Sequence, residues 1–531
     1  MSHLQRLASL FLPLPLQVAA EIRHLRFLQR DPLACQRELL TRLIQRAAAT
    51  RFGRDHGFPN LLGLPFEELY RQYSRAVPIR TYQQYWEQYF KPHQPANGTK
   101  RSLQLRDVSW PGDIPYFCET SGTTAPTKFI PFTKEMFSAN RRAAIDMLAA
   151  YLANRPGSRV AGGKFLYMAG STDLADHGGG ILSGDMSAIT LKERPQMLEP
   201  FVEPKEPLSS APWEERLDGM ARLLLMDEQI HVVSGVPPWL LLLFKRCEEF
   251  SGVRVQEALP HLDLVIHGGA SLAPYRDEFL RLFPDRQPDF LEVLPSSEAF
   301  MGFQVQGESV MRLTPWYGAF FEFVPFEQLD ESGVPRADAD TVPLEQVVSG
   351  QRYAVILSTC AGLWRYHIGD TLRFLDTEQY RIEFTGRDKF LDRFEEKVTQ
   401  AEVEGAVAAL NAELGGGVRE FMVGPDIAGR RHLWVLACRG NGPDTQQAAR
   451  FLDRFLQEAN ADYATFRNQG RINLPSVLVG DEERIYRWSF DERGKLGGQS
   501  KIPHIDPTVR GELITSLAGQ IRDSHPAFSN P

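Results

Sequence analysis

The segment Tyr116-Phe-Cys-Glu-Thr-Ser-Gly-Thr-Thr-Ala-Pro-Thr-Lys128 combines hydroxyl residues, one glycine and a lysine between two apolar runs. Gly122 permits a tight turn and a close approach of a ligand to the backbone. Hydroxyls and N–H groups in such a loop suit a polyphosphate, and Lys128 adds a positive charge. A Walker loop requires a second glycine directly before the lysine, which this segment lacks. Taken alone, the segment is equally consistent with an ordinary turn.

Further polar motifs follow in a fixed order along the chain. They are His267-Gly-Gly-Ala270, Leu294-Pro-Ser-Ser-Glu298, Leu363-Trp-Arg-Tyr-His-Ile-Gly-Asp370, Thr385-Gly-Arg-Asp-Lys389 and Gly494-Lys-Leu-Gly-Gly-Gln-Ser-Lys501. This order resembles that of adenylate-forming enzymes. Ser358-Thr-Cys-Ala-Gly-Leu-Trp-Arg-Tyr-His-Ile-Gly-Asp370 most closely resembles the Gretchen Hagen family of acyl acid–amido synthetases, the auxin-responsive branch of that superfamily. Ala48 to Gly57 is also similar to that branch, so the resemblance spans nearly the whole chain.

Composition excludes several other classes of protein. The chain has 531 residues, of which 43% are hydrophobic and 24% charged, with a net charge of −8. Its length predicts two or more globular domains, and the absence of a dense Lys/Arg run argues against nucleic acid as a main partner. The five cysteines form no C-x-x-C pair, which favours reduced thiols in a cytoplasmic protein. The apolar segment from Leu7 to Ala20 is too short to span a membrane. We expect a monomer.

Hydrophobic periodicity predicts an α/β fold. Residues 1–110 are mostly helical, Tyr116 to Phe132 is a strand, loop and strand, and Glu135 to Leu152 is a helix. Leu262 to Ile266 is a buried parallel strand that ends at a glycine pair. From Gly318 onward β-type runs dominate, which predicts an antiparallel sheet or a barrel-like β lobe beside the α/β layers.

The C-terminal part has the pattern of a smaller α+β domain. Thr399 and Glu402 form a capping box that opens a helix ending near Leu414. The other expected elements are strands over Leu433 to Ala437 and around Val477 and Ile485, and helices over Trp213 to Met226, Pro238 to Phe250 and Thr445 to Ala459. We place a domain boundary near Gly386, which gives an N-terminal adenylation domain (1–385) and a mobile C-terminal domain (386–531). The resemblance implies that Asp388 or Lys389 is the hinge.

The resemblance also implies a role for each motif. ATP would be bound by Ser121, Gly122, Thr123, Thr124, Gly268, Gly269, Ser296, Ser297, Asp370 and Arg387. Glu298 would bind Mg²⁺, because a hard cation takes one or two carboxylates together with phosphate oxygens. Lys501 and Lys128 would act in catalysis, with Lys495 as a competitor for the role of Lys501. Met147 and Tyr151 would line the acyl pocket.

The expected function is ATP-dependent adenylation of a carboxylic acid, followed by amide formation with an amino acid. ATP and Mg²⁺ are the expected cofactors, and the expected substrates, a carboxylic acid and an amino acid, are small molecules. A ligase that uses coenzyme A as the acceptor and a nucleotide-binding module without catalysis are the alternatives. The tyrosine that stacks on adenine in relatives is replaced here by Leu294-Pro295, and Phe300 or Phe303 could substitute for it.

Overall fold

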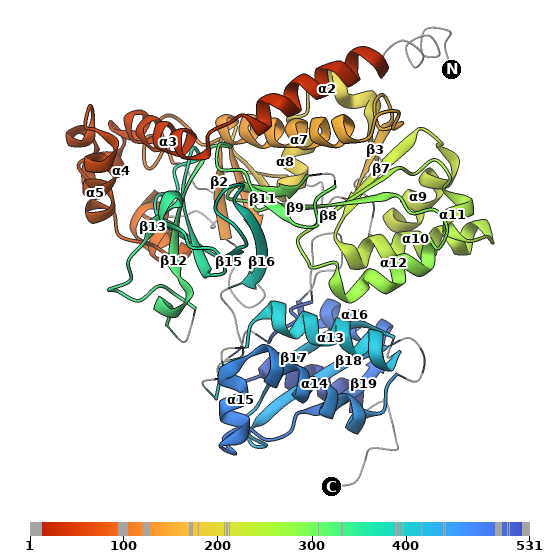
Figure 1. Cartoon of the computed structure of the whole chain (residues 1–531). Helices are drawn as coiled ribbons and strands as arrows, with labels where there is room; N and C mark the ends of the chain where they lie inside the picture. The colour runs from red at the N-terminus through yellow and green to blue at the C-terminus, as the bar shows by residue number, and fades with distance from the viewer. Residues whose placement is uncertain are drawn as a thin grey trace.

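The computed structural model of the chain combines helical layers, a large twisted sheet and a smaller C-terminal unit (Figure 1). It describes residues 13–93, 105–120, 128–168, 174–178, 180–205, 208, 211, 213–305, 307–330, 333–387, 391, 393–394, 396, 398–415, 417–438, 440, 442–493, 502–506, 508 and 510–522. The mixed α/β fold predicted from the sequence is confirmed. In this part of the chain no helix is long and apolar enough to cross a membrane.

The large sheet contains twelve strands among the described residues, in the order β13-β12-β14-β15-β16-β11-β10-β9-β8-β7-β3-β6. Their bounds are β3 Lys164–Tyr167, β6 Val202–Glu203, β7 Ile230–Gly235, β8 Leu264–Gly268, β9 Asp289–Pro295, β10 Phe300–Gln304, β11 Met311–Leu313, β12 Ala319–Pro325, β13 Val342–Pro343, β14 Arg352–Thr359, β15 Tyr366–Phe374 and β16 Arg381–Arg387. Strands β3, β6, β7, β8 and β9 are parallel to one another, whereas β9 to β16 pair antiparallel. The expected antiparallel region therefore continues the parallel sheet through the β9–β10 hairpin.

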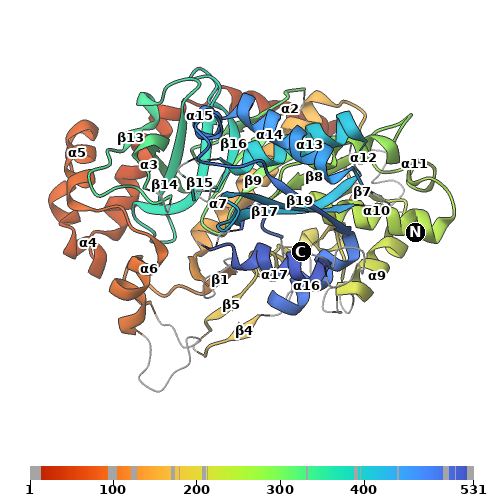
Figure 2. The same cartoon turned by 90° about the horizontal axis from the view of Figure 1, so that it is seen from below.

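Helices cover this sheet on the side away from the C-terminal unit (Figures 1 and 2). Helix α2 (Pro13–Leu28) packs along α7 (Lys134–Asn154), and α3 (Pro32–Ala47) lies beside them. Asp31 caps α3 by accepting the N–H of Leu33 at 2.9 Å. Thr133 caps α7 in the same way, through the N–H of Met136 at 3.1 Å. The shorter helices of the N-terminal region are α4 Arg51–Asp55, α5 Phe66–Ala76, α6 Tyr82–Tyr85 and α8 Met186–Lys192.

A second group of helices packs beside the parallel strands. Its members are α9 Trp213–Met226, α10 Pro237–Ser251, α11 Val255–Ala258 and α12 Arg276–Leu282. The predicted helices over residues 213–226 and 238–250 are confirmed, because their apolar residues form one buried cluster against β7 and β8. Strand β8 is an apolar run buried on both faces, as expected for a parallel strand covered by helices.

A separate small sheet has the strand order β2-β1-β5-β4 among the described residues. The bounds are β1 Tyr116–Thr120, β2 Lys128–Phe132, β4 Ala175–Asp176 and β5 Leu182–Gly184. Strands β1 and β2 pair antiparallel, which confirms the predicted strand, loop and strand, and the last described pair is Thr120 with Lys128. The ends of the predicted phosphate loop are therefore held together by this hairpin.

The C-terminal unit, defined as the described residues from Gln400 to Arg522, packs helices on a three-stranded sheet of order β17-β18-β19. The elements are α13 Gln400–Leu414, β17 Val418–Asp426, β18 Arg431–Cys438, α14 Thr445–Ala459, α15 Ala461–Asn468, β19 Ser476–Asp481, α16 Glu482–Arg493 and α17 Glu512–Arg522. The capping box is confirmed: the carboxylate of Glu402 accepts the N–H of Thr399 at 2.7 Å, and the Thr399 hydroxyl accepts the N–H of Glu402 at 3.4 Å.

The strand predicted around Ile485 is wrong, because Ile485 lies in helix α16. Glu482 and Glu483 occupy the first turn, where negative charges stabilise a helix N-terminus. Ile485 and Trp488 are both buried at a spacing of three residues, which places them on one helical face. An amphipathic helix therefore replaces the expected strand.

The C-terminal unit contacts the N-terminal region through several side chains. Arg419 forms an ion pair with Glu278 of α12, and the hydroxyl of Tyr275 lies 3.4 Å from the Glu420 carboxylate. The rings of Trp239 and Tyr486 lie 5.5 Å apart. Gly386, one residue before the end of β16, lies against Gln400, the first residue of the C-terminal unit.

Candidate active site

The predicted phosphate loop begins directly after β1 and ends at Lys128 on β2. Ser121, Gly122, Thr123 and Thr124 lie outside the described residues. The ammonium group of Lys128 lies 5.8 Å from the centre of the Tyr82 ring, and the Tyr82 hydroxyl accepts the N–H of Phe129 at 2.8 Å. These contacts fix Lys128 at the end of the loop.

Lys128 also lies close to strand β15. Burial, together with the positive charge of Lys128, lowers the pKa of His367 to about 4. The backbone N–H of His367 donates to the carbonyl of Arg80 at 2.9 Å, which holds the start of β15 against Arg80. This arrangement brings the end of the phosphate loop next to the strand that carries Asp370.

Asp370 is a buried residue of β15 and is the register partner of Arg387 on β16. The next pair, Thr371 and Gly386, is joined by a hydrogen bond of 3.1 Å from the threonine hydroxyl to the glycine carbonyl. Gly386 has a φ of 105°, and a Cβ added to it would lie 2.6 Å from the Cβ of Gln400. Glycine is therefore required where β16 meets the first residue of α13. The side chain of Arg387 lies outside the described residues.

Glu298 lies in the turn between β9 and β10 and is 7% exposed. The turn is closed by Ser296, whose hydroxyl accepts the N–H of Ala299 at 3.0 Å and whose N–H donates to the Ala299 carbonyl at 2.9 Å. The Ser296 hydroxyl thus has a structural role, while Ser297 and Glu298 occupy the tip of the turn. Burial raises the pKa of the Cys118 thiol on β1, and the carboxylate of Glu298 raises it further. Glu298 therefore lies near the strand that leads into the phosphate loop.

The glycine pair lies at the end of β8, beside β9. A Cβ on Gly268 would lie 2.4 Å from the carbonyl oxygen of Val293, so only glycine allows this approach of the two strands. Gly269 has a φ of 80°. Since Val293 precedes the Ser296–Glu298 turn on β9, the glycine pair and the turn lie at the same end of neighbouring strands.

Two groups of aromatic and apolar candidates are buried in the protein core. Met147 and Tyr151 lie between α7 and the sheet, and the Tyr151 hydroxyl donates to Asp289 at 3.0 Å. Phe300 and Phe303 belong to the same buried cluster. Their rings pack on other aromatic rings, so they have a structural role.

The predicted late lysine, Lys501, and its competitor Lys495 lie outside the described residues, as do Asp388 and Lys389. Residues 502–506, which follow Lys501 directly, pack on the C-terminal unit. The imidazole of His504 is buried between two carboxylates, 2.8 Å from Glu404 and 2.9 Å from Glu420. His504 was missed in the sequence because isolated histidines carry no spacing signal, although it follows the late lysine by three positions.

A buried ion pair between Arg365 and Glu322 was also missed. The guanidinium lies 3.1 Å from the Glu322 carboxylate and donates to the carbonyls of Ser74 and Val77 at 2.6 and 2.7 Å. Arg365 has a φ of 43°, an uncommon conformation for an arginine. Arg365 lies in the Leu363–Asp370 motif, so this motif connects the N-terminal helices to the large sheet and also carries Asp370.

The architecture joins a large mixed sheet to a small α+β unit, and β16 with Arg387 leads from one to the other. The chain belongs to the GH3 family. Its sequence matches the GH3 family N-terminal domain over residues 21–249, the central domain over residues 313–387 and the C-terminal domain over residues 401–508.

Named relatives agree with this assignment. The chain is 31% identical over 295 residues to an indole-3-acetic acid-amido synthetase GH3.8 of Oryza sativa subsp. indica, a match that covers 51% of this chain and 47% of the relative. It is 27% identical over 265 residues to indole-3-acetic acid-amido synthetase GH3.4 of Arabidopsis thaliana, covering 46% and 43%. The chain thus spans about half the length of the curated relatives that it matches.

Solved structures share the fold over a greater length. The structure of AtGH3.15 acyl acid amido synthetase in complex with 2,4-DB has a TM-score of 0.73 at 18% identity, covering 95% of this chain and 96% of that one. A 2-hydroxyisobutyryl-CoA ligase in a postadenylation state has a TM-score of 0.54 at 14% identity, with 91% of each chain covered. At these identities the likeness concerns the fold.

Proposed function

We propose that this protein is an acyl acid–amido synthetase that uses ATP. In the first step an oxygen of the carboxylate attacks the α-phosphorus, and the bond to the departing pyrophosphate breaks. In the second step the amine of an amino acid attacks the acyl carbon of the adenylate, AMP leaves and the amine loses a proton. The observation that carries this proposal is that Lys128 lies near His367 of β15, and Glu298 near Cys118 of β1, in a chain of the GH3 family.

Asp370 and Arg387 would bind the ribose and phosphate of the nucleotide. A carboxylate can accept hydrogen bonds from two neighbouring hydroxyls, and the pairing of β15 with β16 sets the arginine backbone opposite it. The loop from Ser121 to Thr124 would bind the β- and γ-phosphates through its hydroxyls and N–H groups. Gly268 and Gly269 would allow adenine to approach the backbone, with Ser296 and Ser297 at the neighbouring turn.

Glu298 would hold Mg²⁺ together with phosphate oxygens. Its carboxylate is buried, and among the described residues no group of three or more His, Cys, Asp or Glu side chains could hold a metal by itself. A donor set of one carboxylate plus phosphates fits Mg²⁺, which usually keeps several waters and takes few protein ligands. When bound, the ion offsets the charge of the triphosphate.

Lys501 would stabilise the charge that develops on the α-phosphate during adenylation. It would come from a mobile C-terminal domain (386–531) that rotates against the N-terminal domain (1–385) about Asp388 or Lys389. The contacts around His504 support this role, since they fix the segment that follows Lys501 on the C-terminal unit. The acyl group would lie along α7, the helix that carries Met147 and Tyr151.

The proposal is tested by ATP–pyrophosphate exchange over a panel of carboxylic acids. A supporting result is acid-dependent exchange, followed by ATP-dependent conjugates when amino acids are added, as detected by mass spectrometry. Exchange without amino-acid conjugates, but with thioester on addition of coenzyme A, would assign a CoA ligase instead. No exchange with any acid, together with retained ATP binding, would indicate a non-catalytic nucleotide-binding module.

Two further expectations belong to this proposal. Five free cysteines, of which four are buried, support a reducing compartment such as the cytoplasm. The monomeric state is tested by size-exclusion chromatography with light scattering.

A further inference from the structure

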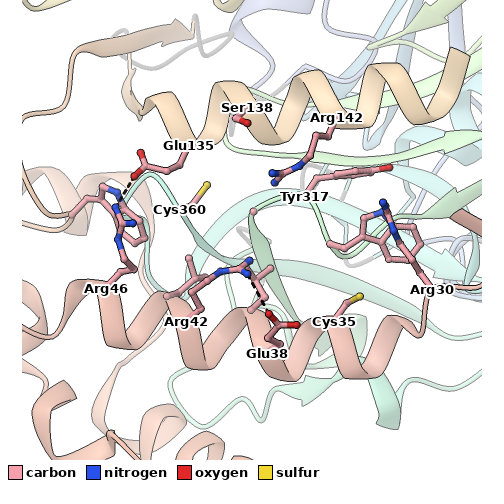
Figure 3. A pocket seen from close by; sticks show the side chains of 15 residues that line it. Arg30, Cys35, Glu38, Arg42, Arg46, Glu135, Ser138, Arg142, Tyr317 and Cys360 are labelled. Carbon is pink, nitrogen blue, oxygen red and sulfur yellow. Dashed lines mark hydrogen bonds and ion pairs between the residues drawn. The ribbon is translucent and has the colours of Figure 1, made fainter. Parts of the chain in front are cut away.

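A cavity of about 430 Å³ lies between helices α3 and α7 (Figure 3). Both helices cover the face of the N-terminal region that is turned away from the C-terminal unit (Figure 1). The cavity is therefore separate from Asp370 and Arg387 of the proposed nucleotide site, which lie on the strand pair that leads into the C-terminal unit. It also lies on another face of α7 from Met147 and Tyr151, which are buried in the core.

The lining of this cavity carries an excess of positive charge. Four arginines, Arg30, Arg42, Arg46 and Arg142, face two glutamates, Glu38 and Glu135. Figure 3 shows Arg42 and Arg142 reaching toward the cavity from opposite helices.

Three of the arginines have acidic partners. Arg42 lies 3.5 Å from Glu38, and Arg46 lies 2.7 Å from Glu135. Arg30 lies 2.9 Å from Asp146, a buried residue on the inner side of α7. Among the described residues, Arg142 has no ion-pair partner, which leaves its charge for a ligand.

Aromatic rings form the apolar part of the cavity wall. The guanidinium of Arg30 lies 5.4 Å from the centre of the Trp316 ring, and that of Arg46 lies 5.8 Å from the centre of the Trp110 ring. Tyr317 also lines the cavity, with its hydroxyl directed to Asp146. Cations stacked on aromatic rings beside open space form a surface that suits an anionic head group attached to an apolar body.

We propose that this cavity is a second binding site, specific for a small organic anion. The ligand would combine an apolar ring or chain with a carboxylate or phosphate group. The charged group would pair with Arg142 and Arg42, and the apolar body would lie against the tryptophans.

The floor of the cavity is connected to the proposed active site. Burial and the charge of Glu135 raise the pKa of the Cys360 thiol to about 12, against the opposing charges of Arg142 and Arg42. The Cys360 carbonyl accepts the Thr133 hydroxyl at 2.8 Å, and Thr133 caps α7 directly after the strand that begins at Lys128. A ligand in the cavity would thus contact the motif that ends at Asp370.

Protection of Cys35 from alkylation tests the site without relying on enzymatic activity. Cys35 lines the cavity and is half-buried, whereas the other four cysteines are buried. The full chain is treated with iodoacetamide at increasing phenyl phosphate concentration, and the modification of the Cys35 peptide is followed by mass spectrometry. We expect saturable protection of Cys35. Arg142→Gln should raise the concentration needed for half-protection about tenfold, the loss expected for one charged hydrogen bond.

Arg141→Gln is the matched control, because Arg141 is the exposed neighbour of Arg142 on α7 and does not line the cavity. In the Arg141→Gln variant, phenyl phosphate should protect Cys35 at the same concentration as in the wild-type protein. Inorganic phosphate should require a higher concentration than phenyl phosphate, because it cannot use the aromatic wall. An absence of protection, or equal protection of the Arg142→Gln variant, would overturn the site. Equal potency of the two phosphates would overturn its specificity for an organic anion.

Discussion

Asp370 on β15 and Arg387 on β16 are directly opposed in the antiparallel register of the large sheet. The pairing is reinforced one residue further on, where the hydroxyls of Thr371 and Thr385 lie 2.8 Å apart and Thr371 also donates to the Gly386 carbonyl. A buried carboxylate is thus set opposite an arginine at the last residue of the strand that leads to the C-terminal unit. In the proposed function, this pair binds the nucleotide at the point where the two domains meet.

Replacing Asp370 should weaken ATP binding. In the proposed function, Asp370→Ala would remove two charge-assisted hydrogen bonds to the ribose, so the ATP concentration for half-maximal exchange should rise about a hundredfold. The measurement is ATP–pyrophosphate exchange at saturating acid. Asp376→Ala is the control, since Asp376 pairs with Arg381 at the turn of the same hairpin. A normal ATP requirement in Asp370→Ala would refute the ribose assignment.

Replacing Lys501 should slow adenylation without preventing ATP binding. The lysine would stabilise charge that develops only during the reaction, so Lys501→Ala should reduce exchange by about 10²–10³-fold. ATP binding, measured by calorimetry, should remain close to wild type. Lys495→Ala is the matched control on the same segment. If Lys495→Ala loses the activity and Lys501→Ala keeps it, the catalytic role belongs to Lys495.

A proline at the proposed hinge should separate the two half-reactions. Asp388→Pro restricts the backbone rotation that the C-terminal domain would need after adenylation. Exchange should therefore persist, whereas amide formation should fall by at least about tenfold. Asp388→Ala, which removes the carboxylate but leaves the backbone free, should retain both activities. Equal losses in both steps for Asp388→Pro would contradict a hinge at this position.

Removing the buried Arg365 should destabilise the protein. Arg365→Ala leaves the Glu322 carboxylate, which is 1% exposed, without its main cation. Breaking a buried ion pair in this way costs about 3–5 kcal/mol. Urea unfolding followed by tryptophan fluorescence measures the change. Arg373→Ala, which breaks an exposed ion pair with Glu383, should cost less than about 1 kcal/mol. Similar losses for the two variants would argue against this anchoring role.

Stability should depend on pH through His504. Burial alone would lower the pKa of His504, but its hydrogen bonds to Glu404 and Glu420 and their charges raise it to about 10. The folded state therefore holds this proton more tightly than the unfolded state. The stabilisation is complete below the unfolded pKa of about 6.5 and is lost as the pH rises toward 10, with a slope of at most about 1.4 kcal/mol per pH unit.

His504→Gln should remove this alkaline dependence, as measured by urea unfolding at several pH values between 7 and 10. Glu292, near Glu404, titrates at lower pH. Burial, with the charges of Glu404 and Glu383, raises the pKa of Glu292 to about 7, so its contribution changes below the range of His504. An unchanged slope in His504→Gln above pH 8 would exclude the histidine as its source.

The sequence pattern predicted a helix or strand correctly where the residues within that segment are enough to select it. The helix from Gln400 is set by the Thr399–Glu402 capping box, and β8 is set by an apolar run too short for a helix. The error at Ile485 has a different origin. A short apolar segment fits either a strand or a helix, and the burial of Trp488 against α17 and the sheet selects the helix.

The site was predicted in part. Glu298 and Asp370 are buried and lie near β1 and β16, respectively, but Ser296 closes a turn, a role that its sequence motif did not indicate. The contacts of His504 and Arg365 could not be predicted, since their partners lie far away in the chain. The position of Arg142 beside a cavity could not be predicted either, since the cavity is formed by segments that are distant in the sequence.

The sequence by itself determined the family, the mixed α/β class and the order of the polar motifs, because these depend on residue types at fixed local spacing. Only the tertiary structure decided which charges are neutralised. Arg365 meets Glu322 across the core, while Arg142 faces an open cavity between two helices. The physical reason is that the electrostatic free energy of a side chain depends on burial and on the distance to its partners, and folding alone sets both.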